Sequence, residues 1–265
     1  MPNIASYTVQ CAICDRKSKQ QYFMSYSIFG NPDLDFRPPP MFRNTMESWI
    51  HECPYCGYIN TKLNEPCDLS LKEILDAHHE IESGFDWGQF PEKLHDVIRY
   101  TLAHTLKMKN GCDEAAERFL NSTLWDNFEA LRFAKLGAML AKSNDHHGAA
   151  EQFLRVAWFY DDQGKEQEAT HWRKMSIEQV EIVLNRPQAQ VSEELICIYA
   201  DMLRRVGDFN AVLQLDENHL CETSYIMLLR YQKELSKNED RSAHKINKEN
   251  ALVAEKYQRG MYFSL

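Results

Sequence analysis

The 265-residue chain lacks any apolar run long enough for a membrane-spanning helix, which needs about 20 consecutive, mostly apolar residues. Its first residues, MPNIASYTVQ, also lack the basic stretch and following apolar stretch of a secretory signal peptide. We therefore expect a cytoplasmic protein with no membrane partner.

Recognisable catalytic motifs are missing as well. The chain has no glycine-rich phosphate loop, no G-x-S-x-G turn and no H-E-x-x-H pair. Two pairs of adjacent histidines, His78-His79 and His146-His147, are poor joint metal ligands, because neighbouring side chains on a helix point about 100° apart. We expect these histidines on the solvated surface, and we expect the protein not to be an enzyme.

Positive charge is scarce too. The net charge is −9, made up of zero over residues 1–66, −11 over residues 67–235 and +2 over residues 236–265. A protein that holds nucleic acid through its phosphates needs a basic face. The charge therefore disfavours nucleic acid and favours a basic partner for the acidic middle of the chain.

Cysteine, in contrast, is present in two closely spaced pairs. Four of the eight cysteines form the pairs Cys11-Cys14 and Cys53-Cys56, each with two residues between the thiols. In a reducing compartment such pairs indicate metal ligands, and two of them complete a tetrahedral shell of four sulfurs. Gly57 suits the tight turn that follows the second pair. We expect one structural zinc ion, with iron as the second choice, and the closed shell leaves no position for a catalytic water.

The other cysteines and most tryptophans stand alone. Lone cysteines are most often small buried apolar side chains, and tryptophans in apolar patterns belong to the core. This prediction covers Cys67, Cys112, Cys197 and Cys221, and Trp87, Trp125, Trp158 and Trp172.

The 38 residues between Cys14 and Cys53 must form structure of their own. The stretch Lys19–Phe29 is rich in aromatic and β-branched residues and predicts a strand, and Ser48–Cys53 predicts its return partner. The sequence therefore predicts a zinc ribbon with a long insertion at its tip.

That insertion contains GNPDLDFRPPP, residues Gly30–Pro40, with four of the nine prolines of the chain. Its prolines predict a stiff, extended segment from Phe36 to Pro40. At a spacing of two, an extended chain puts Asp33, Asp35 and Arg37 on one side and Leu34 and Phe36 on the other. We prefer a structural role, in which Arg37 pairs with carboxylates and holds the ribbon to the helical part. The alternative is an open binding site formed by Asp33, Asp35, Arg37 and Arg43.

From about Asp68 the pattern becomes helical and repeats itself. The spans Leu102–Asn121 and Leu136–Arg155 match at an offset of 34 residues, which is the tetratricopeptide period. The matched positions include Leu102 and Leu136, Ala103 and Gly137, Ala115 and Ala149, and Phe119 and Phe153. A related unit, Ile196–Leu215, follows an extra helix predicted at about Lys165–Leu184.

The two Cys-x-x-Cys segments, or knuckles, the second of which reads C-P-Y-C-G-Y, resemble those of a bacterial family of uncharacterised zinc-ribbon proteins. The strings RVAWFYDDQGKEQEA and ADMLRRVGDFNAV resemble the tetratricopeptide-like half of the same family. The resemblance spans most of residues 7–220. It implies this architecture and a bacterial cytoplasmic setting, and no activity comes with it.

Taken together, these patterns predict an α+β fold with segregated parts. We expect a zinc ribbon at 1–66, a tetratricopeptide-like helical domain at 67–235 and a polar segment at 236–265. The expected function is a non-enzymatic scaffold that binds a protein or peptide through its helical repeats. Two alternatives stay open: an enzyme or small-ligand receptor with a site between loop 30–43 and the helices, and a nucleic-acid-binding ribbon.

Overall fold

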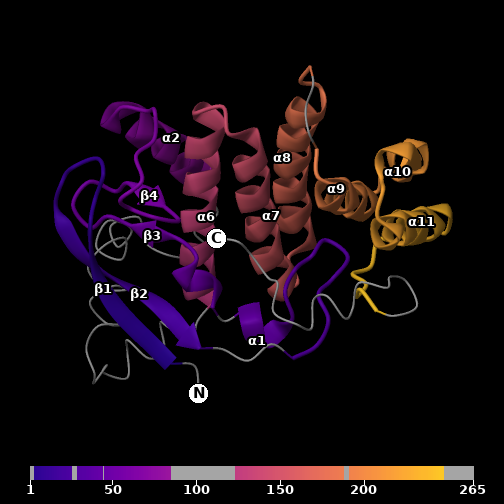
Figure 1. Cartoon of the computed structure of the whole chain (residues 1–265), viewed down its shortest axis with the longest axis horizontal. Helices are drawn as coiled ribbons and strands as arrows, with labels where there is room; N and C mark the ends of the chain where they lie inside the picture. Colours follow the sequence, from indigo (N-terminus) through magenta and orange to yellow (C-terminus); the bar gives the residue numbers. More distant parts are fainter. Residues whose placement is uncertain (1–2, 26–28, 44, 85–122, 188–190, 248–265) are drawn as a thin grey trace. The chain divides into compact units, whose positions relative to one another are not determined.

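The computed structural model describes residues 3–25, 29–43, 45–84, 123–187 and 191–247 (Figure 1). Its strands are β1 (Asn3–Gln10), β2 (Lys17–Ser25), β3 (His51–Glu52) and β4 (Ile59–Asn60). Its helices are α1 (Pro40–Arg43), α2 (Leu71–Gly84), α6 (Thr123–Lys142), α7 (His146–Asp162), α8 (Glu166–Leu184), α9 (Glu193–Val206), α10 (Phe209–Gln214) and α11 (Thr223–Lys237), with 3-10 turns at Met46–Ser48 and Glu217–His219. The described chain is thus mostly helical, with short strand pairs near the N-terminus, and none of its helices is long and apolar enough to cross a membrane.

The chain divides into two compact units that interleave along the sequence. One unit contains residues 1–6, 21–49 and 170–265, and the other contains residues 7–20 and 50–169. We call the first the loop unit, because it includes the insertion, and the second the knuckle unit, because it includes both cysteine pairs. The predicted domain boundaries stay a prediction.

The strands pair differently from the prediction. We expected Lys19–Phe29 to pair with Ser48–Cys53, but β2 pairs with β1, and β3 pairs antiparallel with β4. The reason is that each cysteine pair reverses the chain and so closes a hairpin of its own. Ser48, where we expected the return strand to begin, lies in the 3-10 turn Met46–Ser48, and the strand begins only at His51.

Four of the described helices end in one recurring type of turn. The residue that follows α6, α7, α9 and α11 by one or two positions has a positive φ, at Asn144, Gly164, Gly207 and Glu239 respectively. The next backbone N–H then donates to the carbonyl five residues earlier, over 2.8–3.0 Å: Asp145 to Leu140, Lys165 to Tyr160, Asp208 to Leu203 and Asp240 to Leu235. This is the Schellman arrangement, which satisfies the otherwise unpaired carbonyls at a helix end.

Three of these turns lead directly into the next helix, and in two of them an aspartate caps that helix. The Asp145 carboxylate accepts a hydrogen bond from the Gly148 backbone N–H at 2.9 Å, and the Asp208 carboxylate accepts one from Ala211 at 3.1 Å. Each aspartate therefore caps the helix that it precedes, α7 or α10. An Asn-Asp or Gly-Asp dipeptide thus both ends one helix and begins the next.

The predicted repeat is tested only in part. The span Leu102–Asn121 lies outside the described residues, whereas Leu136–Arg155 is a helix–turn–helix, with α6 and α7 side by side (Figure 1). Ala149 and Phe153 are buried there, as predicted. The extra helix predicted at Lys165–Leu184 is confirmed as α8.

The crossing of α6 and α7 depends on Gly137. A Cβ atom added to Gly137 would lie 2.7 Å from Cε1 of Phe153, which is 2% exposed. The matched position in the repeat is therefore small because the next helix passes directly over it.

We expect Gly137→Ala to destabilise the protein by about 1–3 kcal/mol, although alanine is intrinsically the better helix former, because the added methyl overpacks the helix crossing. The free energy of unfolding in urea measures this. The control is Gly84→Ala in α2, where the added Cβ would meet nothing within 4 Å and stability should not fall. Adding Phe153→Leu to Gly137→Ala should restore part of the loss, and an unchanged stability of Gly137→Ala itself would contradict the close approach.

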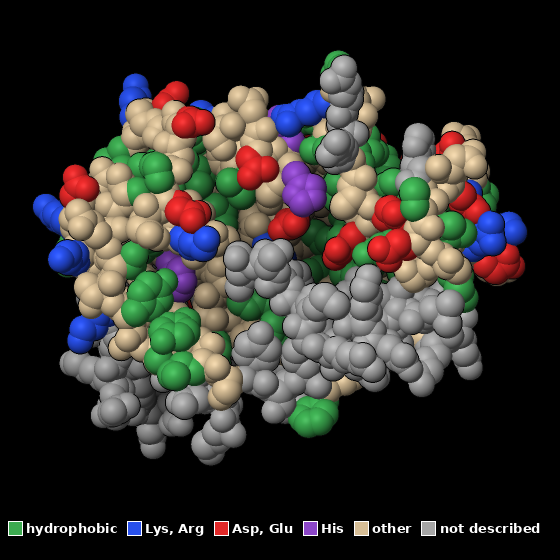
Figure 2. Space-filling view, in the orientation of Figure 1, with side chains coloured by type: hydrophobic (Ala, Val, Ile, Leu, Met, Phe, Trp, Pro, Cys, Tyr) green, Lys and Arg blue, Asp and Glu red, His purple; other side chains and the backbone are tan. Residues whose placement is uncertain are grey.

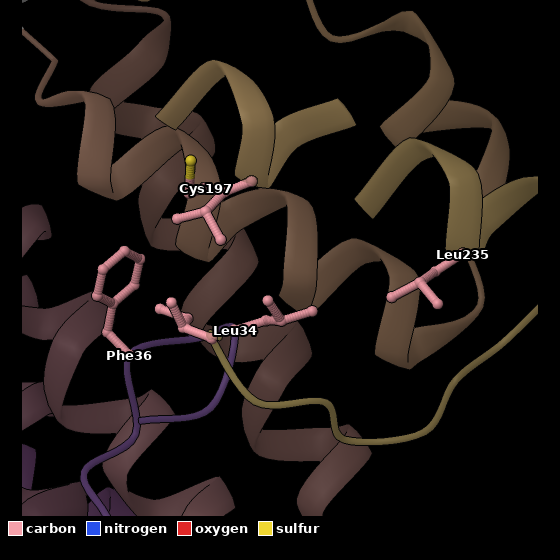
Figure 3. Close-up of a cluster of buried hydrophobic side chains, with 6 residues drawn as sticks. Leu34, Phe36, Cys197 and Leu235 are labelled. Atoms are coloured by element: carbon pink, nitrogen blue, oxygen red, sulfur yellow. The ribbon is translucent and has the colours of Figure 1, made fainter. Parts of the chain in front are cut away.

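The proline-rich insertion is buried within the loop unit. Leu34 and Phe36 join a cluster with Cys197, Leu228, Leu235 and Ile246 (Figure 3). The backbone N–H of Leu34 donates to the His244 carbonyl, and that of Ile246 donates to the Pro32 carbonyl, both at 2.8 Å. The insertion therefore pairs with the segment that follows α11, and the prediction that Leu34 and Phe36 face an apolar surface is confirmed.

The insertion is not extended at Phe36, contrary to our prediction. Phe36 has a φ of 60°, and its N–H donates to the Asp33 carbonyl at 2.9 Å, while the Asp33 N–H donates to the Arg37 carbonyl at 2.9 Å. The chain thus turns back on itself between Asp33 and Arg37. The proline rule predicted the conformation of each residue locally but not this turn, which the buried hydrophobic cluster stabilises.

A buried arginine anchors the end of the loop unit. Arg204 in α9 is fully buried and donates through Nη2 to Asp201 Oδ1 at 2.6 Å and through Nε to Gln232 Oε1 at 2.7 Å. Its Nη1 donates to the carbonyls of Asp240 and Ser242, at 2.6 and 2.9 Å. One guanidinium thus joins α9, α11 and the segment that pairs with the insertion.

Candidate metal centre

The two cysteine pairs form turns of matching construction. In the first, the Cys11 N–H donates to the Arg16 carbonyl and the Asp15 N–H donates to the Cys11 carbonyl, both at 3.0 Å. In the second, the Cys53 N–H donates to the Tyr58 carbonyl at 2.8 Å and the Gly57 N–H donates to the Cys53 carbonyl at 3.0 Å. Each turn thus directs two thiols to one side.

A left-handed residue follows the second cysteine of each turn. Gly57 has a φ of 74°, as its position predicted, and Asp15 takes the same place in the first turn with a φ of 58°. Aspartate tolerates this conformation better than most other residues with a side chain.

The four thiols converge. The Sγ atoms of Cys11, Cys14, Cys53 and Cys56 all lie within 4.8 Å of one another. Cys11 Sγ lies 3.7 Å from Cys56 Sγ, and Cys14 Sγ lies 3.6 Å from Cys53 Sγ. Four sulfurs at about 2.3 Å from a central zinc ion are about 3.8 Å apart in a tetrahedron. The four side chains therefore fit one tetrahedral metal ion.

The thiols differ in their readiness to ionise before a metal binds. Burial raises the pKa of Cys53 and of Cys56 above the ordinary value. For Cys14 the net effect is the opposite. Burial alone would raise its pKa, but a hydrogen bond from the Arg16 backbone and the contacts with the other three thiols outweigh burial, so the pKa lies below the ordinary value. Metal binding must deprotonate all four thiols, so metal affinity should increase with pH.

The centre is held to α6 by charged side chains. Glu52, next to Cys53, lies with Oε2 3.7 Å from Arg132 Nε and with Oε1 3.8 Å from Lys135 Nζ. Arg132 also donates to the Ile50 carbonyl at 2.8 Å, and Lys135 pairs with Glu82 of α2 at 2.7 Å. Glu52 and Lys135 are both under 10% exposed, so this network is buried.

A pocket of about 510 Å³ opens beside the second turn. Its lining residues come from β3, the second turn, α2 and α6: Glu52, Pro54, Tyr55, Cys56, Gly57, Leu71, Leu75, His78, Glu82 and Lys135. Sequence reasoning did not identify this pocket, although Lys135 stands as a charged residue within the apolar stretch ALRFAKLGAML of α6.

The candidate residues of the insertion form a separate group in the loop unit. Asp33, Asp35 and Arg37 are all under 10% exposed. Arg43 donates through Nη2 to Asp33 Oδ2 at 2.9 Å and through Nε to the Pro38 carbonyl at 2.6 Å. These groups are therefore packed inside the loop unit.

Burial of these carboxyl groups makes the stability of the loop unit sensitive to pH. Burial, helped by the charge of Asp35, raises the pKa of Asp33 from 3.8 to about 6, against the opposing effect of Arg43. The pKa of Asp35 is raised as well, by burial first and then by Asp201. The folded chain therefore holds these protons more tightly than the unfolded chain.

It follows that the free energy of unfolding should fall as the pH rises from about 4 through about 6, since ionising Asp33 costs more in the folded chain. Asp33→Asn should flatten this slope, whereas Asp76→Asn, at an exposed position of α2, should leave it unchanged. Urea denaturation at a series of pH values measures the slopes. Equal slopes for the wild type and Asp33→Asn would contradict the assignment.

Two predictions about isolated residues are wrong. His78 is buried at 4% exposure rather than solvated, because α2 places it on the side that lines the pocket. Cys221 is exposed, just ahead of α11, rather than buried. Cys197, Trp158 and Trp172 are buried, as predicted. Cys112 and Trp87 lie outside the described residues.

Comparison with known proteins adds no assignment: no family model, no curated protein and no solved structure matches the chain. The surface is informative in another way. On the face shown in Figure 2, the described basic, acidic and hydrophobic side chains are interspersed, with several basic ones along the left edge.

Proposed function

We propose that the protein is a non-enzymatic, zinc-dependent interaction protein of the cytoplasm, which binds a basic segment of a protein or peptide. The observation that carries this proposal is the convergence of four thiols within 4.8 Å. Four thiolates fill the tetrahedral coordination of zinc, so the ion is structural and holds the knuckle unit in its binding shape.

Three further observations support the binding role. The helix pairs α6–α7 and α9–α10 are each joined by a Schellman turn. Helix pairs of this kind build helical-repeat arrays, which bind partners on one face. The chain carries a net charge of −9, which complements a basic partner. The carboxyl groups of the insertion, which would serve the enzyme alternative, are buried. The resemblance to bacterial zinc-ribbon proteins with a tetratricopeptide-like half is part of the same proposal.

Affinity capture tests it. The full chain would be immobilised in its zinc-loaded form, alongside Cys53→Ser as the matched metal-free control, and exposed to nuclease-treated lysate of the source cell. We expect a basic protein that is retained by the loaded chain and lost with the variant. Equal recovery on both forms, or retention of oligonucleotides in place of protein when the nuclease is omitted, would contradict the proposal.

A further inference from the structure

The pocket beside the second cysteine turn has a mixed lining that suits one class of ligand. Its outer wall is apolar and accessible, since Tyr55, Leu71 and Leu75 are 54%, 38% and 46% exposed. Pro54 lies next to Tyr55 in the same lining. Large apolar side chains that remain this exposed around a hollow commonly mark a binding site.

The inner part of the pocket is charged and negative on balance. Two carboxylates, Glu52 and Glu82, face a single ammonium group, Lys135 Nζ, at 3.8 and 2.7 Å. His78 is the remaining titratable side chain among the lining residues, apart from Tyr55 and the metal ligand Cys56.

The metal centre adds to this negative charge. A divalent ion held by four thiolates carries a net charge of −2, and one of its ligands, Cys56, lines the pocket. The field of the centre, together with the acidic side chains of the lining, therefore attracts a cation to the pocket. Arg132, which lies 3.7 Å from Glu52 on α6, adds a positive charge behind the lining, and Glu129, whose Oε2 lies 2.9 Å from Arg132 Nη1, offsets it.

We infer that this pocket binds the side chain of a lysine or arginine from a basic partner segment, with its methylene groups on Leu71, Leu75 and Tyr55 and its charged end near Glu52 and Glu82. This inference rests on the proposed function and names the chemistry of its partner. A pocket of about 510 Å³ has room for one such side chain and part of its backbone. Arg16 of the chain itself lies over the Tyr55 ring, 5.1 Å from its centroid, so this ring already accepts a guanidinium at close range.

Peptide binding to the full, zinc-loaded chain tests the inference. Three fluorescent peptides of equal length would be compared by anisotropy: lysine alternating with glycine, and the same peptide with glutamate or with leucine in place of lysine. We expect the lysine peptide to bind most tightly, with an affinity that falls as salt is added.

Two charge changes at the mouth of the pocket locate the binding. Leu75→Lys should lower the affinity for the lysine peptide by about tenfold or more, and Leu75→Asp should bind the peptide more tightly than Leu75→Lys does. Both variants lose the same apolar contact at this 46% exposed position and differ in the sign of the added charge. The matched control is Leu213→Lys in α10, whose side chain is 38% exposed and lies outside the pocket lining. It should leave the affinity unchanged.

The outcomes separate this inference from the proposed function. Equal affinities for Leu75→Lys and Leu213→Lys, or preferential binding of the glutamate or leucine peptide, would overturn the pocket assignment even if capture yields a protein partner. Failed capture together with lysine-peptide binding that depends on Leu75 would overturn the proposed function and leave the pocket as a site for small cationic ligands.

Discussion

Replacement of Cys53 by serine should abolish metal binding and unfold the knuckle unit. Cys53 is fully buried, and its Sγ lies 3.6 Å from Cys14 Sγ in the four-thiol cluster. Structural zinc supplies about 10–16 kcal/mol of apparent binding free energy in zinc-finger peptides. The hairpin of β3 and β4 has two residues in each strand and cannot be stable without such support.

Native mass spectrometry should find one metal ion per chain in the wild type and none in Cys53→Ser, and elemental analysis identifies the metal. Hydrogen exchange should become fast in β3, β4 and α2, while α9 and α11, which belong to the loop unit, keep their protection. Cys221→Ser is the matched control, since Cys221 is exposed and should leave metal content and exchange unchanged. A wild-type chain that purifies with four reactive thiols and no metal would refute the metal centre.

Replacement of Arg204 by methionine should destabilise the loop unit by about 3–5 kcal/mol. The change removes four hydrogen bonds and leaves the Asp201 carboxylate buried, at 2% exposure, without its cation. Breaking a buried pair from one side costs this much because the remaining charge is no longer compensated. Urea denaturation followed by circular dichroism measures the change.

The control for this prediction is Arg230→Ala. Arg230 pairs with Glu217 at 2.8 Å but has a side chain that is 68% exposed, so its loss should cost about 0–1 kcal/mol. Adding Asp201→Asn to Arg204→Met should recover part of the lost stability, because the uncompensated charge is then gone. If Arg204→Met costs no more than Arg230→Ala, the network is not the anchor of the loop unit.

Local spacing in the sequence determined which four cysteines converge, one helix and two buried side chains of the helix–turn–helix. Two cysteines three positions apart face the same side through a tight turn, so the four-thiol cluster and the positive φ of Gly57 followed from the sequence. The helix at Glu166–Leu184 and the burial of Ala149 and Phe153 followed from periodicity. In each case the cause lies within a few residues of the feature or in a regular repeat.

Tertiary structure decided what depends on distant partners. The β-forming residues of Lys19–Phe29 predict a strand but not its partner. Both β1 and the predicted partner Ser48–Cys53 could supply the hydrogen bonds that such a strand needs, and the fold selects β1. The segment Phe36–Pro40 was predicted extended from its prolines, yet Phe36 has a φ of 60° and joins the buried cluster that contains Cys197 and Ile246. Likewise, the sequence does not show why a lysine stands at position 135 in an apolar stretch. The fold brings Glu52 and Glu82 to Lys135, and a charge is buried only where opposite charges compensate it.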